Sequence, residues 1–310
     1  MLMKIAVVGV GAIGGIYGGL LANVGHDVHF LLHSDFDHVQ RNGLRIDSVL
    51  GDFQLPQVNA YQSAADMPQC DVVIVALKTT ANMQLAPILD VLLKPETTLL
   101  LLQNGLGAEE FLAQHYPNNS LLSGLCFICC SKIGPGHILH LDQGAIRLGE
   151  YNPQQEAGIT PKMRDIAELF ANTGISIHFT PNLLQARWEK LVWNIPFNGL
   201  SVVLQQSTQG LLTDRHCRDL LVELMEEVIA AANHCGFTIQ PSYAQVLLHA
   251  TDKMADYQPS MLLDYQNKRP LELESIYWEP IRTAAERGFD MAKTRVIAQQ
   301  LAFLDQKNSP

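Results

Sequence analysis

Three polar residues in the second half of the chain have the types and the spacing for acid–base chemistry. Lys190, Asn194 and Asn198 are four residues apart, so on a continuous helix they share one face. A lysine that is partly buried loses part of its preference for the charged state, which suits a proton donor to a carbonyl oxygen that is receiving hydride. The alternative is a solvated helix face on which Lys190 pairs with Glu189 or Glu226.

The helix that must position these residues contains a proline. Pro196 removes one helical hydrogen bond and disfavours the helical conformation of Ile195, so we expect the helix to kink or end there. Two more polar residues stand where later helices are expected to begin. Taken alone, Ser260 is typical of a helix N-cap, and Glu272 is typical of an acid in a first helical turn.

The N-terminal stretch indicates the ligand. An apolar β-branched run leads into Gly9, Gly11 and Gly14, and a helical pattern that opens with Ala12 and Ile13 follows. In this motif the first glycine permits a tight turn, the second lets the backbone approach a pyrophosphate, and the third lets helix and strand pack closely. The phosphates then meet the free N–H groups of the helix. The pattern predicts a Rossmann dinucleotide site.

The end of the second strand, expected over 28–32, bears on which dinucleotide binds. In NAD enzymes an acidic residue near this point binds the ribose hydroxyl, and such a carboxylate would repel a 2′-phosphate. Here the strand is followed by His33 and Ser34, and the first acid is Asp35. This order favours NADP. As alternatives, Asp35 and Asp37 turn inward toward the ribose or lie in a solvated loop.

Two further strands, expected over 71–77 and 97–102, end in polar residues. Ligands of doubly wound sheets bind at this carboxyl edge. Lys78 is therefore expected to face the cofactor; the alternative is an exposed lysine at a helix start. Asn104 lies in a glycine-containing turn, where its amide can hold a nicotinamide ribose, a substrate carboxylate or only its own loop.

The remaining pattern divides the chain into two domains. A small hairpin is expected around Gly51, a further strand over 121–130, a turn at Pro135, and two short paired strands over 137–141 and 145–148. Beyond Pro181 the spacing is helical almost throughout, with helices expected over 183–193, 217–235, 242–257 and 271–287. We therefore predict an α/β Rossmann domain over 1–181 and an all-α domain over 182–310.

Composition excludes several classes of protein. The net charge is −10 and no basic stripe occurs, so nucleic acid is not expected as a partner. The uncharged run over 5–24 resembles a membrane span or signal peptide, but its six glycines and the strand that follows favour the Rossmann unit, so no membrane association is expected.

The cysteines indicate neither disulfides nor a metal. Cys126, Cys129 and Cys130 have one zinc-like spacing but no second pair, so they are interpreted as buried strand thiols and no metal is expected. With no export signal, the protein is expected in a reducing cytoplasm.

Seven short motifs occur in an order that resembles the ketopantoate reductase (2-dehydropantoate 2-reductase) family. They are G-V-G-A-I-G from Gly9, A-L-K ending at Lys78, Q-N-G around Asn104, P-G at Pro135, W-E-K-L-x-x-N from Trp188, S-M-L-x-D from Ser260 and E-L-E from Glu272. The resemblance runs the length of the chain. It implies a Rossmann domain, a helical domain similar to that of 6-phosphogluconate dehydrogenase, and a site in the cleft.

The resemblance also implies residue roles. Lys190 is the proton donor, and the expected substrate-binding residues are Asn104, Lys190, Asn194, Asn198 and Ser260. The expected cofactor-binding residues are Gly9, Gly11, Ala12, Ile13, Gly14, His33, Lys78, Asn104, Cys130 and Glu272. The chain departs from the family pattern at His33, where an arginine is common, and near Gly210, where Thr208 or Gln209 replaces an asparagine.

We therefore expect an NADPH-dependent reductase of a small 2-oxo acid, with ketopantoate as the substrate and pantothenate biosynthesis as the pathway. One alternative is a reductase of another 2-oxo acid in the same family. An alternative from a different class is an NAD(P)-binding regulatory protein without turnover. A homodimer is a family-level expectation.

Overall fold

The computed structural model describes residues 3–153 and 158–308, and its contacts group the chain into two compact units. The first holds the chain up to Gln103 together with Ala108–Leu183. The second holds Asn104–Gly107 and the chain from Leu184 onward. The first unit is α/β and the second is helical, so the predicted fold class is confirmed.

The elements of the first unit alternate as expected for a Rossmann domain. In order they are β1 (Lys4–Val8), α1 (Ala12–Asn23), β2 (Asp27–Leu31), α2 (Phe36–Asn42), β3 (Leu44–Ser48), β4 (Phe53–Leu55), β5 (Asn59–Tyr61), the 3-10 turn η1 (Ala64–Asp66), β6 (Val72–Val75), the 3-10 helix η2 (Thr79–Gln84), α3 (Leu85–Leu92), β7 (Thr98–Leu101), α4 (Ala108–His115), β8 (Leu121–Gly134), β9 (His137–Glu150), α5 (Pro161–Leu169) and β10 (Ile177–Phe179).

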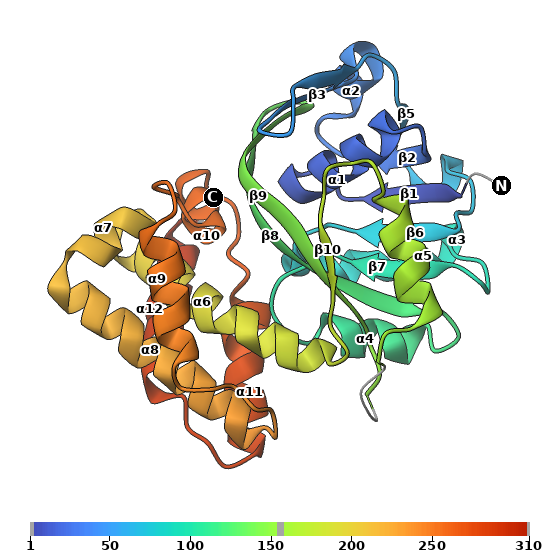
Figure 1. Ribbon diagram of the computed structural model, residues 1–310. Coiled ribbons are helices and arrows are strands. Elements are labelled where there is room, and N and C mark those ends of the chain that lie inside the picture. Colours follow the sequence, from blue (N-terminus) through green and yellow to red (C-terminus); the bar gives the residue numbers. More distant parts are fainter. Residues whose placement is uncertain (1–2, 154–157, 309–310) are drawn as a thin grey trace. The chain divides into compact units, whose positions relative to one another are not determined.

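These strands form one mixed sheet in the order β4-β3-β9-β8-β7-β6-β1-β2-β5, with β10 beside β9 (Figure 1). The strands from β8 through β7, β6, β1 and β2 to β5 are parallel neighbours, which brings their carboxyl ends to one edge. The expected hairpin around Gly51 is confirmed as the antiparallel pair β3 and β4.

Alternation along the strands builds a separate core on each face of the sheet. In β1, Ile5 and Val7 pack on one side with α1 and α5, whereas Ala6 and Val8 pack on the other side with α3 and α4. All four side chains are fully buried. Figure 1 shows α1 and α4 on opposite sides of the sheet. A strand covered on both faces is apolar at every position, which explains the continuous hydrophobic runs in the sequence.

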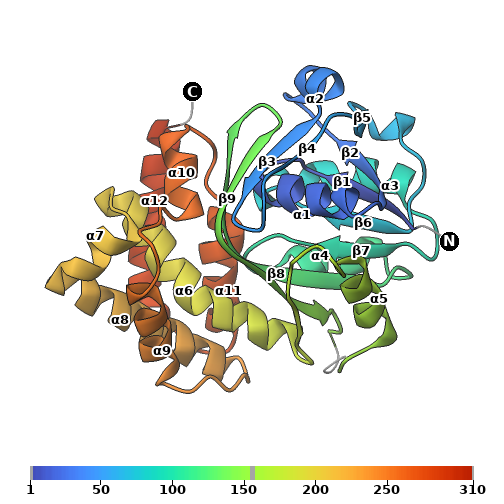
Figure 2. The ribbon, with the colours of Figure 1, turned by 45° about the horizontal axis from the view of Figure 1, so that its top comes forward.

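The prediction of two short paired strands over 137–141 and 145–148 is wrong. These residues form one strand, β9, which pairs antiparallel with the equally long β8 from Leu122 opposite Glu150 to Gly134 opposite His137. Irregularities in the register, one of them at Phe127, let this long hairpin bend. Figure 2 shows the hairpin rising beside α1 toward β3. Residues 142–144, which separate the two expected strands, are of turn-forming types but lie within β9.

The glycines of α1 explain how the hairpin and the sheet can both approach this helix. A methyl group on Gly15 would lie 2.7 Å from Ile138 of β9, and one on Gly18 would lie 2.7 Å from Phe30 of β2. The glycine-rich composition of this helix therefore comes from packing on two sides.

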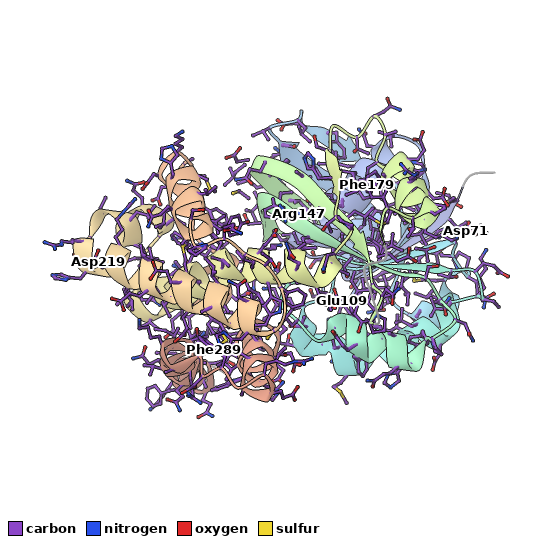
Figure 3. All side chains as sticks on the ribbon, turned by 60° about the horizontal axis from the view of Figure 1, so that its bottom comes forward. Asp71, Glu109, Arg147, Phe179, Asp219 and Phe289 are labelled. Atoms are coloured by element: carbon purple, nitrogen blue, oxygen red, sulfur yellow. The ribbon has the colours of Figure 1, made fainter. Side chains whose placement is uncertain are left out.

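Two carboxylates of the first unit bind groups on neighbouring elements. Asp71, labelled in Figure 3, directly precedes β6; its carboxylate accepts a hydrogen bond from the Lys4 amide at 2.7 Å and pairs with Lys94 at 2.5 Å. Glu109 of α4, also labelled there, is buried and accepts a hydrogen bond from the Ser123 hydroxyl at 2.7 Å. These carboxylates hold neighbouring elements together.

The second unit is helical throughout. Its elements are α6 (Leu183–Leu204), α7 (Thr208–Thr213), α8 (Arg215–His234), α9 (Tyr243–Asp252), α10 (Ser260–Gln266), the π-helix η3 (Glu274–Trp278), α11 (Glu279–Glu286) and α12 (Ala292–Asn308). The apolar stripe expected on α8 is buried at Leu221, Leu224, Met225, Val228 and Ile229. Among the described residues no helix is long and apolar enough to cross a membrane.

The helix α6 does not end at Pro196 but continues to Leu204. Tyr277 of the π-helix is fully buried beside this proline and donates a hydrogen bond to the Ile195 carbonyl at 2.9 Å. Gly199 leaves room for it, since a methyl group there would lie 2.8 Å from the Tyr277 hydroxyl. Packing of Tyr277 against this face therefore holds a helix that local preference alone would interrupt.

Replacing Tyr277 with phenylalanine tests this packing. The variant loses one buried hydrogen bond, so we expect the free energy of unfolding to fall by about 1 kcal/mol. Urea unfolding followed by tryptophan fluorescence measures the helical unit, because all three tryptophans, at 188, 193 and 278, lie in it. The matched control is Tyr265→Phe, since Tyr265 packs against the same core and accepts a hydrogen bond through its backbone. Equal stability of the two variants would contradict the assignment.

Candidate active site

The glycine turn between β1 and α1 is held by close approaches of backbone to backbone. Gly9 has φ of 95°, and a methyl group on it would lie 2.6 Å from the Leu77 amide nitrogen. A methyl group on Gly14 would lie 2.0 Å from the Gly9 carbonyl oxygen. Only glycine fits either position, as the sequence motif requires.

The middle glycine differs, because space remains open above it. Gly11 is the N-cap of α1, its helix has no side-chain cap, and no atom lies within 4 Å of a methyl group built on it. Ala12 and Ile13 begin the helix, whose first turn contains no acidic residue. Uncapped N–H groups at the positive end of a helix attract anions. The cradle therefore fits the pyrophosphate of a dinucleotide.

The loop after β6 contains Lys78, which is half-buried and caps the 3-10 helix η2. The loop is fixed by Gln103, a buried residue that follows β7. The Gln103 amide donates to the Leu77 carbonyl at 2.8 Å and to the Asn82 side chain at 2.7 Å. We did not select Gln103 from the sequence, although its position directly after a buried strand was a usable signal.

At the end of β2, His33 is exposed and Asp35 is buried. The alternative of a solvated loop is therefore wrong for Asp35, whose carboxylate pairs with Lys132 at 2.8 Å. Burial acts to raise the pKa of Asp35, but hydrogen bonds from Lys132 and from the Gly136 amide outweigh it, so the pKa lies below the ordinary value. Lys132 could not be found from the sequence, because 97 residues separate it from Asp35.

The clustered cysteines lie on β8, as expected for strand thiols. Burial raises the pKa of the Cys130 thiol, and the neighbouring Cys126 and Cys129 add to this effect. Burial also raises the pKa of Cys129, to about 11. Both shifts are those of thiols buried in a strand. In the described ranges 3–153 and 158–308, no three His, Cys, Asp or Glu side chains gather in a way that could hold a metal ion.

In the helical unit, Lys190 and Asn104 are brought together although they are 86 residues apart in sequence. The half-buried Lys190 ammonium donates a hydrogen bond to the Asn104 side-chain oxygen at 2.9 Å. The turn that carries Asn104 packs on the π-helix: the Leu106 amide donates to the Ser275 carbonyl at 2.9 Å, and a methyl group on Gly105 would lie 2.3 Å from that oxygen. π-Helical turns of this kind are frequent at functional sites.

The two asparagines of α6, Asn194 and Asn198, lie on the same helix face as Lys190, because the helix is continuous through them. Asn194 is 7% exposed and Asn198 is 2% exposed. The Asn198 side-chain oxygen accepts a hydrogen bond from the Met261 amide at 3.2 Å. This bond ties α6 to the first turn of α10, whose first residue is the half-buried Ser260.

Glu272 is also buried, at 6% exposure, and lies three residues before Ser275. It directly precedes the first helical residue, Leu273, and does not lie within the first turn as its sequence context alone suggests. Thr208, one of the two residues that could replace the family asparagine, is buried and accepts a hydrogen bond from the Tyr257 amide at 3.1 Å. Its side chain thus joins the first residue of α7 to the segment before α10.

A glycine turn built for a dinucleotide, together with a helical unit that holds a lysine against amides, defines an NAD(P)-dependent oxidoreductase. The chain belongs to the ketopantoate reductase family. Residues 5–153 match the family described as "Ketopantoate reductase PanE/ApbA", and residues 182–305 match "Ketopantoate reductase PanE/ApbA C terminal". The resemblance found in the sequence motifs is thereby confirmed.

Individual relatives agree with this assignment. The chain is 48% identical to the 2-dehydropantoate 2-reductase of Nostoc sp. strain PCC 7120 over 98% of its own length and 96% of that protein. The crystal structure of 2-dehydropantoate 2-reductase from Geobacter metallireducens GS-15 matches with a TM-score of 0.92 and 40% identity, over 97% of this chain and 99% of that one. A D-mandelate dehydrogenase with NADH and anilino(oxo)acetate shares the fold, with a TM-score of 0.90 at 19% identity, over 99% of each chain.

Alanine substitutions at Gly11 and Gly14 should separate cofactor binding from folding. Gly14→Ala forces a methyl group against the Gly9 carbonyl, so we expect a loss of about 2 kcal/mol in stability. Gly11→Ala meets no atom of the protein but fills the space above the helix end, so we expect unchanged thermal stability and at least about tenfold weaker dinucleotide binding. Calorimetry and fluorescence titration with NADPH measure the two effects. Tight binding by a folded Gly11→Ala protein would contradict the cradle assignment.

Proposed function

We propose that this protein reduces 2-dehydropantoate (ketopantoate) to pantoate with NADPH, the pantoate-forming step of pantothenate biosynthesis. The observation that carries the proposal is the hydrogen bond between Lys190 and Asn104, on a helix face that continues through Asn194 and Asn198. It is supported by 48% identity to a 2-dehydropantoate 2-reductase over nearly the whole chain.

In this proposal the first unit holds the dinucleotide. Gly9, Gly11 and Gly14, with Ala12 and Ile13 at the start of α1, receive the pyrophosphate. When bound, the reduced nicotinamide supplies a hydride for the C2 carbonyl carbon of the substrate. The further residues proposed to bind the cofactor are His33, Lys78, Asn104, Cys130 and Glu272.

Lys190 is the proposed proton donor. As the carbonyl carbon gains hydride, its π electrons move to oxygen, and the Lys190 ammonium gives a proton to that oxygen to form the hydroxyl of pantoate. The neutral amine then regains a proton from water. The Asn104 oxygen, 2.9 Å from the Lys190 nitrogen, orients the ammonium before the substrate arrives. Such positioning counts because proton transfer requires hydrogen-bond distance in the reacting complex.

The proposed substrate-binding groups are Asn104, Asn194, Asn198 and Ser260. Their amides and hydroxyl match a substrate that presents a carboxylate, a carbonyl and a hydroxyl. Asn198 also holds the first turn of α10, so it fixes Ser260 in addition to any contact of its own with the substrate. A buried amide that serves both purposes would explain why a helix face of asparagines is so deeply covered.

We propose NADPH in preference to NADH. Asp35, the first acid after β2, is buried and already paired with Lys132. Residue 33 is histidine and not the arginine common in the family, so another residue must supply the positive charge that binds a 2′-phosphate. A homodimer and a cytoplasmic location, both expected from the sequence, stay predictions.

Turnover by the purified protein tests the proposal. NADPH or NADH is mixed with ketopantoate and the loss of cofactor absorbance is followed, with Lys190→Ala in parallel. Loss of the proton donor should lower kcat by about two to four orders of magnitude with a smaller change in KM. Lys253→Ala is the matched control, because Lys253 is an exposed lysine of the same unit.

Each other outcome selects a different conclusion. Oxidation with pyruvate or another 2-oxo acid, but not with ketopantoate, would favour the alternative reductase. Tight dinucleotide binding without turnover of any 2-oxo acid would favour the regulatory protein. Unchanged kcat in Lys190→Ala would remove the lysine from the mechanism while leaving the substrate assignment intact.

A further inference from the structure

The carboxylate of Asp35 has donors on both of its oxygens. Lys132 approaches Oδ1 at 2.9 Å and Oδ2 at 2.8 Å. The Ser34 hydroxyl donates to Oδ1 at 3.1 Å, and the Gly136 amide donates to Oδ2 at 3.0 Å. The side chain of Asp35 is only 9% exposed. Its charge is therefore compensated inside the protein.

The position of Asp35 in the chain connects its pairing with Lys132 to cofactor recognition. Asp35 lies 21 residues after Gly14, and it is the first acid after the end of β2. An acid about 20 residues beyond the glycine motif is the group that binds the ribose hydroxyl in NAD-dependent Rossmann domains. In this chain the acid is present at the right distance in sequence, but its oxygens are used elsewhere.

The partner that occupies Asp35 comes from a distant part of the sheet. Lys132 and Gly136 lie at the tip of the β8/β9 hairpin, which passes beside α1 to reach the start of α2. The Lys132 side chain remains 27% exposed. Asp37, Arg41 and Arg45, which also lie near this hairpin tip, are exposed.

We propose that Lys132 is a positioning residue that determines cofactor specificity by holding Asp35 away from the ribose. With the pair intact, the end of β2 presents no uncompensated anion, so a 2′-phosphate is accepted. Without Lys132, the Asp35 carboxylate keeps only the neutral donors of Ser34 and Gly136, so its charge is uncompensated and repels a 2′-phosphate. The inference extends the proposed preference for NADPH and rests on that proposal.

Two nucleotides that differ only in the 2′-phosphate test the inference without any turnover. Calorimetric titrations compare 2′,5′-ADP with 5′-AMP on the full-length protein, and the measured quantity is the ratio of the two dissociation constants. Lys132→Met keeps the length of the side chain but removes its charge. The uncompensated Asp35 carboxylate near the phosphate dianion should weaken the binding of 2′,5′-ADP relative to 5′-AMP by about tenfold. This is the size of a Coulomb repulsion over several Å of water-like medium.

Three more variants make the test specific to charge. Asp35→Asn leaves Lys132 unpaired, so the ratio should move in the opposite direction by a similar factor. The double variant Lys132→Met with Asp35→Asn lacks both charges and should return close to the original ratio. Lys132→Arg retains the pair and should leave the ratio unchanged. A role limited to folding would not give opposite signs for the two single variants.

A folded Lys132→Met protein with an unchanged ratio overturns the inference. If Lys132→Met does not fold, Asp35→Asn decides, and an unchanged ratio there overturns it equally. The proposed function fails by a different measurement, the absence of ketopantoate reduction, so a protein can pass one test and fail the other.

Discussion

The close approach of α1 to the end of β1 is the constraint on which the nucleotide-binding unit depends. Gly9 and Gly14 leave no room for a side chain, so the helix N-terminus lies directly at the carboxyl end of the central strand. This places uncapped N–H groups at the edge where the parallel strands end. The other glycines of α1 allow β9 and β2 to pack against the same helix. One short segment therefore shapes the phosphate cradle and also positions the β8/β9 hairpin beside α1.

In the helical unit, the arrangement of the candidate site depends on the continuity of α6. A helix interrupted by proline would place Asn198 out of register with Lys190, and substrate-side residues would lose their common face. The π-helix supports this arrangement at two points. Its Tyr277 holds the Ile195 carbonyl, and its Ser275 carbonyl holds the turn that carries Asn104. One irregular helix therefore fixes both the lysine's helix and the amide that orients the lysine.

How far the sequence predicts this structure depends on the range of the interactions involved. The glycine turn, the apolar strands and the face shared by Lys190 and Asn194 follow from local periodicity, and they were predicted correctly as elements of a Rossmann and a helical domain. Residues 142–144 have the types of a turn, but pairing with β8 keeps them within the strand β9. The continuation of α6 through Pro196 likewise depends on Tyr277, which is 82 residues away from Ile195. The conformational preferences of neighbouring residues do not reveal partners so distant in sequence.

Asp35 shows the same limit for function. Sequence motifs assign cofactor preference by asking which residue follows the second strand, on the assumption that its side chain is free to meet the ribose. Here the nearest acid is paired with a lysine from a hairpin in another part of the sheet, so under the proposed NADPH preference the presence of an acid does not by itself indicate NAD. The effective charge at the ribose is a property of the folded pair. A specificity rule for this class of site must therefore count the partners of the acid as well as its presence.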